Sequence, residues 1–421
     1  MHLVILGNGA AGATAARFAR VADSSARITV VSDEAALPFS RPALMYLYTG
    51  QLTRDAIRLY PPEFWSRNRI DLVRDRATGV DTAGRRLRLA AGGDLEYDTL
   101  LIATGAVTAA PAWAGAGLAG VQGFVRMADL DTMERDAPRR GVVVGGGLIG
   151  VELAEMLRVR GAEVTLLVRE ESYCAHFLPT PEARIVEAEI RRHGVDLRTS
   201  VDVTALEGDA GGRVAAVHST DGTFATAWVG VATGVAPDLG LAAGAGLETA
   251  RGVLVDSRLR ASAPAVFAAG DCVELRDPPV GRPAVSALWY VAREQGAVAG
   301  RNMAGADSEY APAVFYNSAK FFDLEWQVYG RVDATPPAGE ASLYWADPRG
   351  RRALRVQHAG AGAVLGVSAV GIRLRADACS HWISAGVHVD QALAELRMAV
   401  FDEEFGDAMR VGGQLSAVGS Q

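Results

Sequence analysis

One glycine-rich motif, present twice, constrains the fold of this chain more than any other feature. The first copy, Gly7-x-Gly9-x-x-Gly12, directly follows a short apolar run and opens an alanine-rich, helix-like stretch, after which a second apolar run begins. In such a β-turn-α-β unit, Gly7 permits the tight turn, Gly9 lets the backbone approach a pyrophosphate, and Gly12 lets helix and strand pack closely. We therefore predict a dinucleotide site here, formed by Gly7, Gly9, Ala10, Ala11 and Gly12.

The second copy, Gly145-x-Gly147-x-x-Gly150, repeats this arrangement. A single match would be weak, because 47 of the 421 residues are glycine and a glycine-rich turn alone could give it. Two matches, each between a predicted strand and a predicted helix, are a strong signal. The expected strands span 2–6, 28–31, 142–144 and 164–167, and the expected helices run to residue 20 and over 152–160. The second predicted site comprises Gly145, Gly147, Leu148, Ile149 and Gly150.

The fold class that follows is α/β, with two Rossmann-type dinucleotide-binding domains. An enzyme that holds two dinucleotides is most simply a device for hydride transfer between a nicotinamide and a flavin. In this fold an acid after the second strand commonly holds the ribose hydroxyls, which points to Ser32, Asp33 and Glu34 in the first copy, unless the two acids are solvated loop residues. In the second copy, Arg169 favours the 2′-phosphate of NADPH and Glu170 the 2′-hydroxyl of NADH, and the balance leans slightly to NADPH.

The bulk composition excludes other classes of protein. The length of 421 residues fits about two to four domains, and the net charge of −7 argues against a polyanion-binding surface, so we expect no nucleic-acid partner. The apolar start lacks a basic n-region, and no apolar stretch of about 18 residues occurs, so we expect neither export nor a membrane span. Cys174, Cys272 and Cys379 are widely spaced, which suits a cytoplasmic location and excludes a redox dithiol. We expect no metal site.

The chain changes character at about residue 310. The turn-like segment 347–350 separates two strand-like runs at 343–345 and 353–356, which predicts a hairpin. Residues 363–375 read as a further strand and 389–399 as a helix. The last hundred or so residues are therefore expected to form a smaller α+β domain.

Several further segments resemble the pyridine-nucleotide-disulfide oxidoreductases, flavoproteins with two dinucleotide-binding domains, over essentially the whole chain. Two A-T-G segments resemble the crossover strands of that family, and the run V-F-A-A-G-D-C at 266–272 resembles its second FAD motif, in which the aspartate bonds ribityl or pyrophosphate oxygens. The resemblance implies FAD in the first Rossmann unit and NAD(P)H in the second. The cofactor residues that it adds are Ala103, Thr104, Gly105, Thr233, Gly234, Gly270 and Asp271.

The resemblance also implies the domain borders. The first part of the FAD domain would span 1–108 and its second part 231–309, with the NAD(P)H domain at 109–230 between them and the C-terminal domain at 310–421.

Within the family, the segment P-F-S-R-P-A-L resembles the Y-x-R-P-x-L stretch of ferredoxin and rubredoxin reductases, which adds Arg41 and Pro42 to the flavin site. Disulfide reductases carry their reactive cysteines in this neighbourhood, and here there are none. Trp289 lies in a segment that in these reductases places a tryptophan near the flavin, although a core tryptophan is an equal alternative. Glu152 matches the acid that the family holds near the nicotinamide, and it could also be a first-turn glutamate favoured by the helix dipole.

The sequence departs from the reductase pattern at two flavin-side positions. Tyr46 stands where a lysine usually follows R-P-x-L, and the segment 316–319 replaces a W-S-D-like segment. Lys320, the only lysine among 42 Lys and Arg residues, directly follows that segment. We expect its ammonium to reach the flavin, unless it is simply a solvated surface group. The predicted catalytic residues are Glu152, Trp289 and Lys320.

The function that these features predict is an FAD-dependent NAD(P)H oxidoreductase. By resemblance, its electron acceptor is a small iron–sulfur or rubredoxin-type protein. An oxidase or reductase acting on oxygen or a small molecule is the alternative within the enzymes, and a binding flavoprotein similar to apoptosis-inducing factor is the alternative outside them. A homodimer stays open.

Overall fold

The computed structural model describes residues 1–34, 36–279, 281–401 and, for the backbone alone, 416–418. The chain divides into two compact units. The first unit comprises Met1–Ala109, Phe124–Ala137 and Gly234–Pro312, and the second comprises Ala110–Gly123, Pro138–Thr233 and Ala313–Gln421. This grouping is coarser than the predicted division into domains, which stays a prediction.

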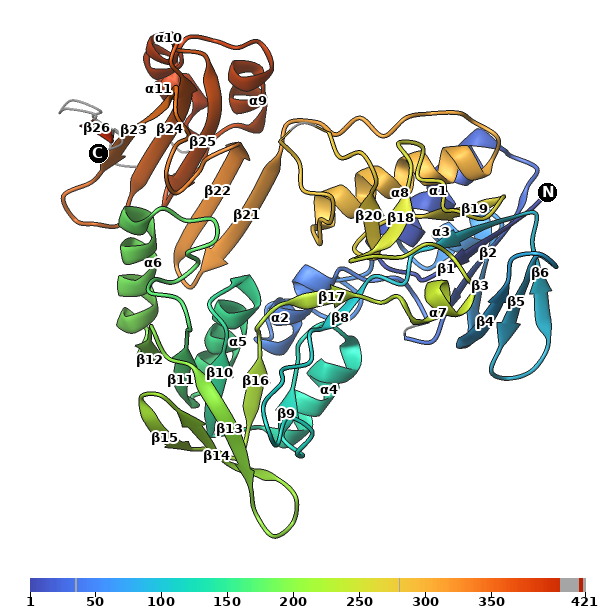
Figure 1. Cartoon of the computed structure of the whole chain (residues 1–421), viewed down its shortest axis with the longest axis horizontal. Helices are drawn as coiled ribbons and strands as arrows, with labels where there is room; N and C mark the ends of the chain where they lie inside the picture. The colour runs from blue at the N-terminus through green and yellow to red at the C-terminus, as the bar shows by residue number, and fades with distance from the viewer. Residues whose placement is uncertain (35, 280, 402–415, 419–421) are drawn as a thin grey trace. The chain divides into compact units, whose positions relative to one another are not determined.

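The first unit is built on a five-stranded parallel sheet in the order β19-β7-β1-β2-β3. Strands β1, β2, β3 and β19 of this sheet are labelled in Figure 1. The fingerprint strand β1 lies at its centre, between β2, which follows the first helix, and β7, which directly precedes the first A-T-G segment. The bounds are β1 (His2–Leu6), β2 (Arg27–Ser32), β3 (Ile70–Arg74), β7 (Thr99–Ile102), β19 (Val266–Ala268), α1 (Ala10–Ala22) and α8 (Trp289–Met303).

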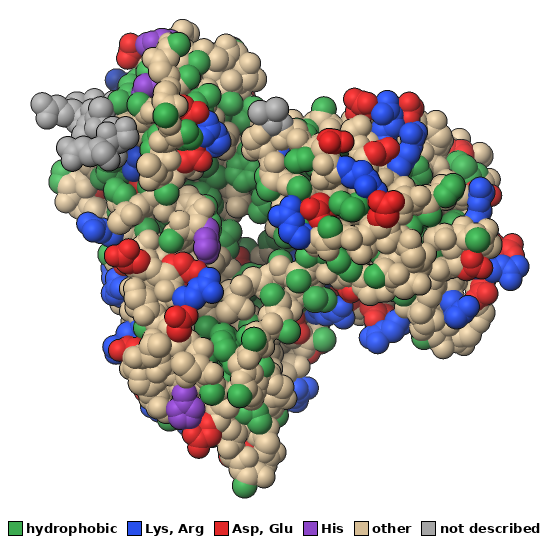
Figure 2. Space-filling model, viewed as in Figure 1, with side chains coloured by type: hydrophobic (Ala, Val, Ile, Leu, Met, Phe, Trp, Pro, Cys, Tyr) green, Lys and Arg blue, Asp and Glu red, His purple; other side chains and the backbone are tan. Residues whose placement is uncertain are grey.

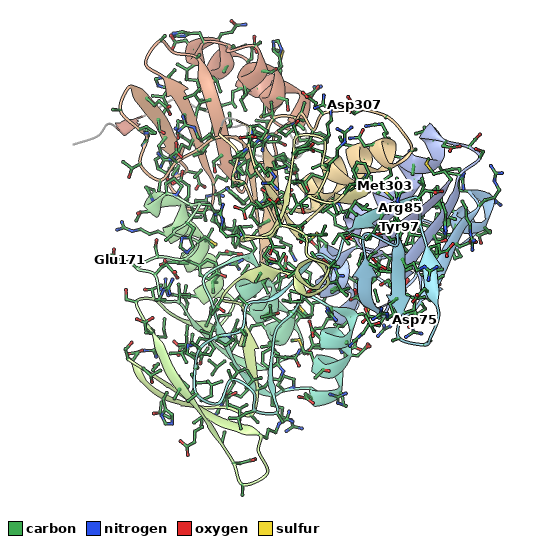
Figure 3. All side chains as sticks on the ribbon, turned by 45° about the vertical axis from the view of Figure 1, so that its right-hand side comes forward. Asp75, Arg85, Tyr97, Glu171, Met303 and Asp307 are labelled. Atoms are coloured by element: carbon green, nitrogen blue, oxygen red, sulfur yellow. The ribbon has the colours of Figure 1, made fainter. Side chains whose placement is uncertain are left out.

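Helices α1 and α8 of the first unit pack at close range. A Cβ atom added to Gly296 would lie 2.3 Å from the carbonyl oxygen of Ala11, and one added to Gly300 would lie 2.3 Å from that of Ala15. Two glycines one helical turn apart are therefore required for this approach. The end of α8 is tied to the sheet, because the hydroxyl of Thr99 donates to the carbonyl of Met303, which is labelled in Figure 3.

The second unit repeats the plan of the first with the parallel order β12-β11-β10-β16-β9. Its fingerprint strand β10 again lies at the centre, between the strand after the helix and the A-T-G strand. The bounds are β9 (Val121–Gln122), β10 (Arg140–Val144), β11 (Glu163–Leu167), β12 (Val195–Arg198), β16 (Val229–Val231), α5 (Leu148–Val159) and α6 (Thr180–Arg192). The predicted α/β fold with two Rossmann-type units is confirmed.

The C-terminal part of the second unit is an antiparallel sheet in the order β21-β22-β25-β24-β23-β26. The predicted hairpin is confirmed, since Ala346 pairs with Ala353 across it. The predicted strand over 363–375 is too long, because Gly371 turns the chain with a φ of +64°. The bounds are β21 (Tyr316–Phe321), β22 (Leu324–Gly330), β23 (Glu340–Ala346), β24 (Ala353–Ala359), β25 (Val364–Val370), β26 (Ser416–Val418), α9 (Ala376–Ser384), α10 (Val389–Ala394) and α11 (Leu396–Ala399).

Smaller elements complete both units. In the first unit these are η1 (Arg41–Ala43), α2 (Leu44–Tyr48), α3 (Glu63–Arg67), β4 (Ala77–Asp81), β5 (Arg86–Leu89), β6 (Asp94–Glu96), β8 (Ala106–Thr108), α4 (Met127–Asp136), β17 (Val235–Pro237), α7 (Gly240–Gly244), β18 (Val253–Val255) and β20 (Val273–Leu275). The second unit adds β13 (Val203–Gly208), β14 (Val214–Ser219) and β15 (Gly222–Ala225).

The surface carries both signs of charge. On the face shown in Figure 2, acidic and basic side chains are interspersed within each unit. In the part of the chain that the structure describes, no helix is long and apolar enough to cross a membrane.

Candidate dinucleotide-binding sites

The three glycines of the first fingerprint have different structural roles. Gly7 has a φ of +109°, and a Cβ there would lie 2.1 Å from the carbonyl oxygen of Ala103. A Cβ at Gly12 would lie 1.9 Å from the carbonyl oxygen of Gly7. Gly9 differs, because a Cβ there would meet no protein atom within 4 Å and its φ of −71° suits any residue. Packing thus explains Gly7 and Gly12, whereas the open space at Gly9 fits a diphosphate group.

The second fingerprint repeats this division of roles. Gly145 has a φ of +135°, and a Cβ there would lie 2.0 Å from the carbonyl oxygen of Ala232. A Cβ at Gly150 would lie 2.3 Å from the carbonyl oxygen of Gly145, whereas one at Gly147 would meet nothing within 4 Å. The second site therefore offers the same open position for a second dinucleotide.

Both open glycines cap the helix that follows them. Gly9 is the N-cap of α1 and Gly147 that of α5, and neither helix has a side-chain cap or an acid in its first turn. The first backbone N–H groups of each helix, together with the positive end of the helix dipole, are thus available to an anion. Glu152 lies beyond the first turn, because α5 begins at Leu148. The alternative explanation of Glu152 as a first-turn, dipole-favoured glutamate is therefore wrong.

The A-T-G segments hold the fingerprint turns in place. The N–H of Ala103 donates to the carbonyl of Leu6 at 2.8 Å, and the N–H of Ala232 donates to that of Val144 at the same distance. Thr104 anchors the segment after β7, because its hydroxyl donates to the carbonyl of Asp238 at 2.8 Å. Thr233 and Gly234 stand at the boundary between the two units, and Gly105 and Gly234 both adopt positive φ.

The residues after β2 form an ordered cluster in the first unit. Glu34 accepts two hydrogen bonds from Arg41, at 2.6 and 3.1 Å, and one from the N–H of Met127 at 3.0 Å. Arg41 also donates to the carbonyl of Val125. Glu34 thus binds the R-P-x-L segment to the start of α4, so few of its lone pairs are left for a ribose. This role was not anticipated from the sequence.

Ser32 and Asp33 have partners of their own. The hydroxyl of Ser32 donates to the side chain of Asn8 in the first fingerprint. Asp33 is paired with Arg76 at 2.9 Å in an exposed ion pair, which is the weaker kind. Asp33 is therefore the acid that a ligand could more easily recruit.

Asp271 and Arg41, two predicted flavin residues, come within electrostatic reach of each other. Burial raises the pKa of Asp271 to about 6, and the charge of Arg41 opposes this rise. The preceding Gly270 has a φ of +87°, and its N–H donates to the side chain of the buried Gln295. The motif is thus fixed by Gln295, a residue that the sequence did not single out.

The end of β11 places two residues of opposite charge beside the second fingerprint. Glu170 lies next to the turn, since its Oε2 would be 3.5 Å from a Cβ on Gly146. Its Oε1 binds Arg169 at 3.2 Å and His176 at 3.3 Å, and these contacts with cations help to lower the pKa of Glu170. The side chain of Arg169 is 72% exposed. The next residue, Glu171, is exposed and is labelled in Figure 3.

Glu152, Glu155 and Lys320 form a charged group in the second unit. Burial, and then the negative charge of Glu155, raise the pKa of Glu152 to about 7. The ammonium of Lys320 lies 2.5 Å from Oε1 of Glu155. Lys320 therefore has a carboxylate partner that the sequence did not predict, and its contact with a flavin stays a prediction.

A turn after β11 supports the second fingerprint. The hydroxyl of the fully buried Tyr173 donates to the carbonyl of Gly147 at 2.6 Å, and the N–H of Cys174 donates to that of Gly146 at 3.0 Å. Burial raises the pKa of Tyr173 well above its usual value, so the hydroxyl keeps its proton. Tyr173 was missed from the sequence, because an isolated tyrosine carries no motif signal.

All three cysteines are free and buried. Burial raises the pKa of Cys272 to about 11 and that of Cys379 to about 12, and it raises that of Cys174 as well. Since the thiolate is the reactive form, these thiols are poor redox groups.

Two further predicted residues lie in helices of the first unit. Trp289 is the first residue of α8 and is partly exposed, and Pro42 lies in η1 beside Arg41.

One cluster in the second unit could in principle hold a metal ion, since ligand atoms of Glu189, His193 and Asp323 lie within 4.8 Å of one another. Arg192, however, binds both Glu189 and Asp323 at 2.6 and 2.9 Å. A cation is thus already supplied by the protein, and we interpret the cluster as an ion-pair network.

Comparison with known proteins agrees with the geometry. The family described as pyridine nucleotide-disulphide oxidoreductase matches residues 1–296. A probable ferredoxin reductase of Castellaniella defragrans is 32% identical over 78% of this chain and 81% of its own length. An NADH oxidase of Methanocaldococcus jannaschii is 31% identical over 77% and 75%. The crystal structure of the ferredoxin reductase for the CYP199A2 system from Rhodopseudomonas palustris has a TM-score of 0.79 and 27% identity, covering 88% of this chain and 91% of that chain.

Proposed function

Because the chain belongs to the pyridine nucleotide-disulphide oxidoreductase family, we propose that it passes electrons from NAD(P)H through FAD to a small ferredoxin- or rubredoxin-type protein. It is an FAD-dependent oxidoreductase that uses NAD(P)H. The carrier is the proposed part. It is supported by relatives that include ferredoxin and rubredoxin reductases, and by three buried thiols that offer no disulfide as acceptor.

The observation that carries the assignment of the two dinucleotides is the pair of open glycine positions. Gly9 in the first unit and Gly147 in the second are the two fingerprint glycines whose identity the protein's own packing leaves unexplained. Gly9, with Arg41 and Asp271, would hold FAD in the first unit. Gly147 would hold NAD(P)H in the second, with Glu152 next to the nicotinamide. FAD supplies the hydride acceptor, while the protein binds and orients the two dinucleotides.

Steady-state oxidation of NAD(P)H tests the acceptor. We expect slow oxidation in air and fast oxidation once a ferredoxin or rubredoxin with a reporter such as cytochrome c is added. Equally fast oxidation in air without a carrier would instead support an oxidase, the candidate that the similarity to the Methanocaldococcus jannaschii protein favours. Very slow flavin reduction by either nicotinamide would support a binding role without catalysis.

The preferred nicotinamide depends on the two residues after β11. We propose NADPH, because the side chain of Arg169 is 72% exposed, so that a phosphate can compete for it with the partly buried Glu170. Arg169→Ala should then raise the Michaelis constant for NADPH about ten-fold or more, since a charge-assisted contact contributes about 1.5–3 kcal/mol. Glu170→Gln is the matched change and should weaken NADH more than NADPH. Equal effects of Arg169→Ala on both cofactors would remove Arg169 from specificity.

The ionisation of Glu152 should appear in the pH profile of hydride transfer. Its raised pKa of about 7 means that the side chain is neutral below this pH and negative above it. A negative charge there favours the positive charge that the nicotinamide ring gains, so flavin reduction should speed up as the pH rises through about 7. In Glu152→Gln the profile should be flat, and at pH 8 the reaction should be slower by about ten-fold, equivalent to about 1.4 kcal/mol. Stopped-flow reduction measures both the pH profile and the rate at pH 8. A pH profile that is unchanged in Glu152→Gln would show that Glu152 does not promote hydride transfer.

A further inference from the structure

The carboxylate of Glu155 is an unusual buried acid in the second unit. Its side chain is only 5% exposed, and Oε1 accepts the ammonium of Lys320 at 2.5 Å. The other oxygen, Oε2, is buried and has no hydrogen-bond partner among the described residues. A buried carboxylate oxygen without a donor is costly, so this atom calls for an explanation.

Lys320 reaches Glu155 from the C-terminal sheet. It lies on β21, which packs against α5, and its side chain is 33% exposed. Its cross-strand neighbour Glu325 is paired with Arg373. The chain uses arginine at every other cationic side-chain position apart from its seven histidines, and the cation that pairs with Glu155 of α5 is its single lysine.

Glu152 is a second acid close to Glu155 on α5. Residues three apart on a helix lie side by side, so Glu152 and Glu155 share one face of α5. Burial raises the pKa of Glu152, and the negative charge of Glu155 raises it further. Tyr173 and Cys174 also pack here, but the raised pKa of each keeps it neutral near pH 7. Arg158, further along α5, donates to the carbonyls of Ala162 and His193 instead.

We propose that Lys320 and Glu155 are a positioning pair that sets the ionisation of Glu152, and that this, rather than contact with the flavin, is the role of the only lysine. Lys320 binds the carboxylate of Glu155, and the negative charge of Glu155 favours the protonated form of Glu152 near neutral pH. That proton would supply the donor that Oε2 of Glu155 otherwise lacks. The consequence for hydride transfer rests on the proposed function, which places Glu152 next to the nicotinamide.

If this proposal holds, substitutions of Lys320 and of Glu155 should shift the pKa of Glu152 in opposite directions. Lys320→Met removes the cation and leaves the two acids, so the pKa of Glu152 should rise by about one pH unit or more. Glu155→Gln removes the like charge and leaves the cation, so the pKa of Glu152 should fall by a similar amount. Lys320→Arg keeps the charge and should resemble the wild type. A residue with only a packing role would give no such opposite shifts.

The single lysine allows a direct measurement on the wild-type holoenzyme. Reductive methylation with ¹³C-formaldehyde labels Lys320 and the N-terminal amine while keeping their charge, and the signal that is absent from Lys320→Arg belongs to Lys320. In an NMR titration of the oxidised protein, the Lys320 methyl signal should show an inflection near pH 7. This inflection should disappear in Glu152→Gln and should move in Glu155→Gln. The signal of the N-terminal amine is the internal control.

Two results would overturn the proposal. The first is a Lys320 signal without an inflection between pH 6 and 8, or with one that persists in Glu152→Gln. The second is flavin reduction in Lys320→Arg that is slowed as much as in Lys320→Met, which would place the lysine at the flavin. Failure of the proposed function would look different. If the Lys320 signal follows Glu152 in the NMR titration but the pH profile of hydride transfer does not depend on Glu152, the positioning role of Lys320 and Glu155 is supported and the placement of Glu152 next to the nicotinamide is wrong.

Discussion

Gly9→Val is expected to give a folded protein that has lost its FAD. The substitution adds a side chain at the one glycine of the first fingerprint where a Cβ meets no protein atom within 4 Å. The backbone at Gly9, with φ −71° and ψ −167°, is accessible to valine. The fold should therefore survive, whereas the side chain fills the space that the pyrophosphate needs. We expect the flavin content after purification to fall by at least about ten-fold, corresponding to a loss of about 1.4 kcal/mol or more in binding.

The control for Gly9→Val is Gly244→Val. Gly244 lies in the same unit, also has open space around it, and does not have a positive φ. This variant should keep its flavin. Flavin release on denaturation and circular dichroism of the folded protein give the two readouts. A Gly9→Val protein with one FAD per chain would show that the open position is not the diphosphate site.

Glu182→Ala should destabilise the second unit more than any surface change. Glu182 on α6 and Arg355 on β24 are both almost fully buried, at 1% and 2% exposed, and are joined by two hydrogen bonds of 2.6 and 3.0 Å. The guanidinium also lies over the ring of Tyr344. Removal of the carboxylate leaves a buried, uncompensated charge, which costs about 3–5 kcal/mol. The midpoint of denaturant-induced unfolding, followed by a probe in this unit, measures the loss.

Two further variants show whether burial is the cause. The double change Glu182→Leu with Arg355→Met should recover most of the lost stability, since a buried ion pair can often be replaced by apolar groups. Arg140→Ala breaks an exposed pair with Glu163 in the same unit and should cost no more than about 1 kcal/mol. An effect of Glu182→Ala as small as that of Arg140→Ala would contradict this explanation.

The repeated parts of the fold were predictable because several local signals agreed there. The predicted strand over 2–6 coincides with β1, and the glycine spacing placed both fingerprint turns. The same agreement was absent from the C-terminal part. The predicted helix over 389–399 is two short helices, α10 and α11, which meet at Glu395, and α9 was not predicted. Sheet order and helix breaks there depend on packing between segments far apart in the sequence.

The candidate sites show the same limit. Glycines could be assigned because their roles follow from backbone geometry within one turn. The partners of charged side chains could not, since Glu34 meets Met127 and Lys320 meets Glu155 across 93 and 165 residues. A sequence motif predicts the contacts of a residue only where the contacting residues are close to it in the sequence. This is also why Tyr173, which holds the carbonyl of Gly147, carried no signal.

Anaerobic stopped-flow reduction of Gly147→Val tests most directly the claim that the two fingerprints hold two different dinucleotides. Gly147, like Gly9, has open space around a Cβ and an extended backbone, with φ −110° and ψ −174°, so the fold and the first site should be unaffected. We predict a protein with its full complement of FAD whose flavin is reduced by NAD(P)H at least about a hundred-fold more slowly at low substrate concentration, a loss of about 2.7 kcal/mol. Dithionite should still reduce it fully. Reduction by NAD(P)H at the wild-type rate, or loss of FAD from this variant, would contradict the account.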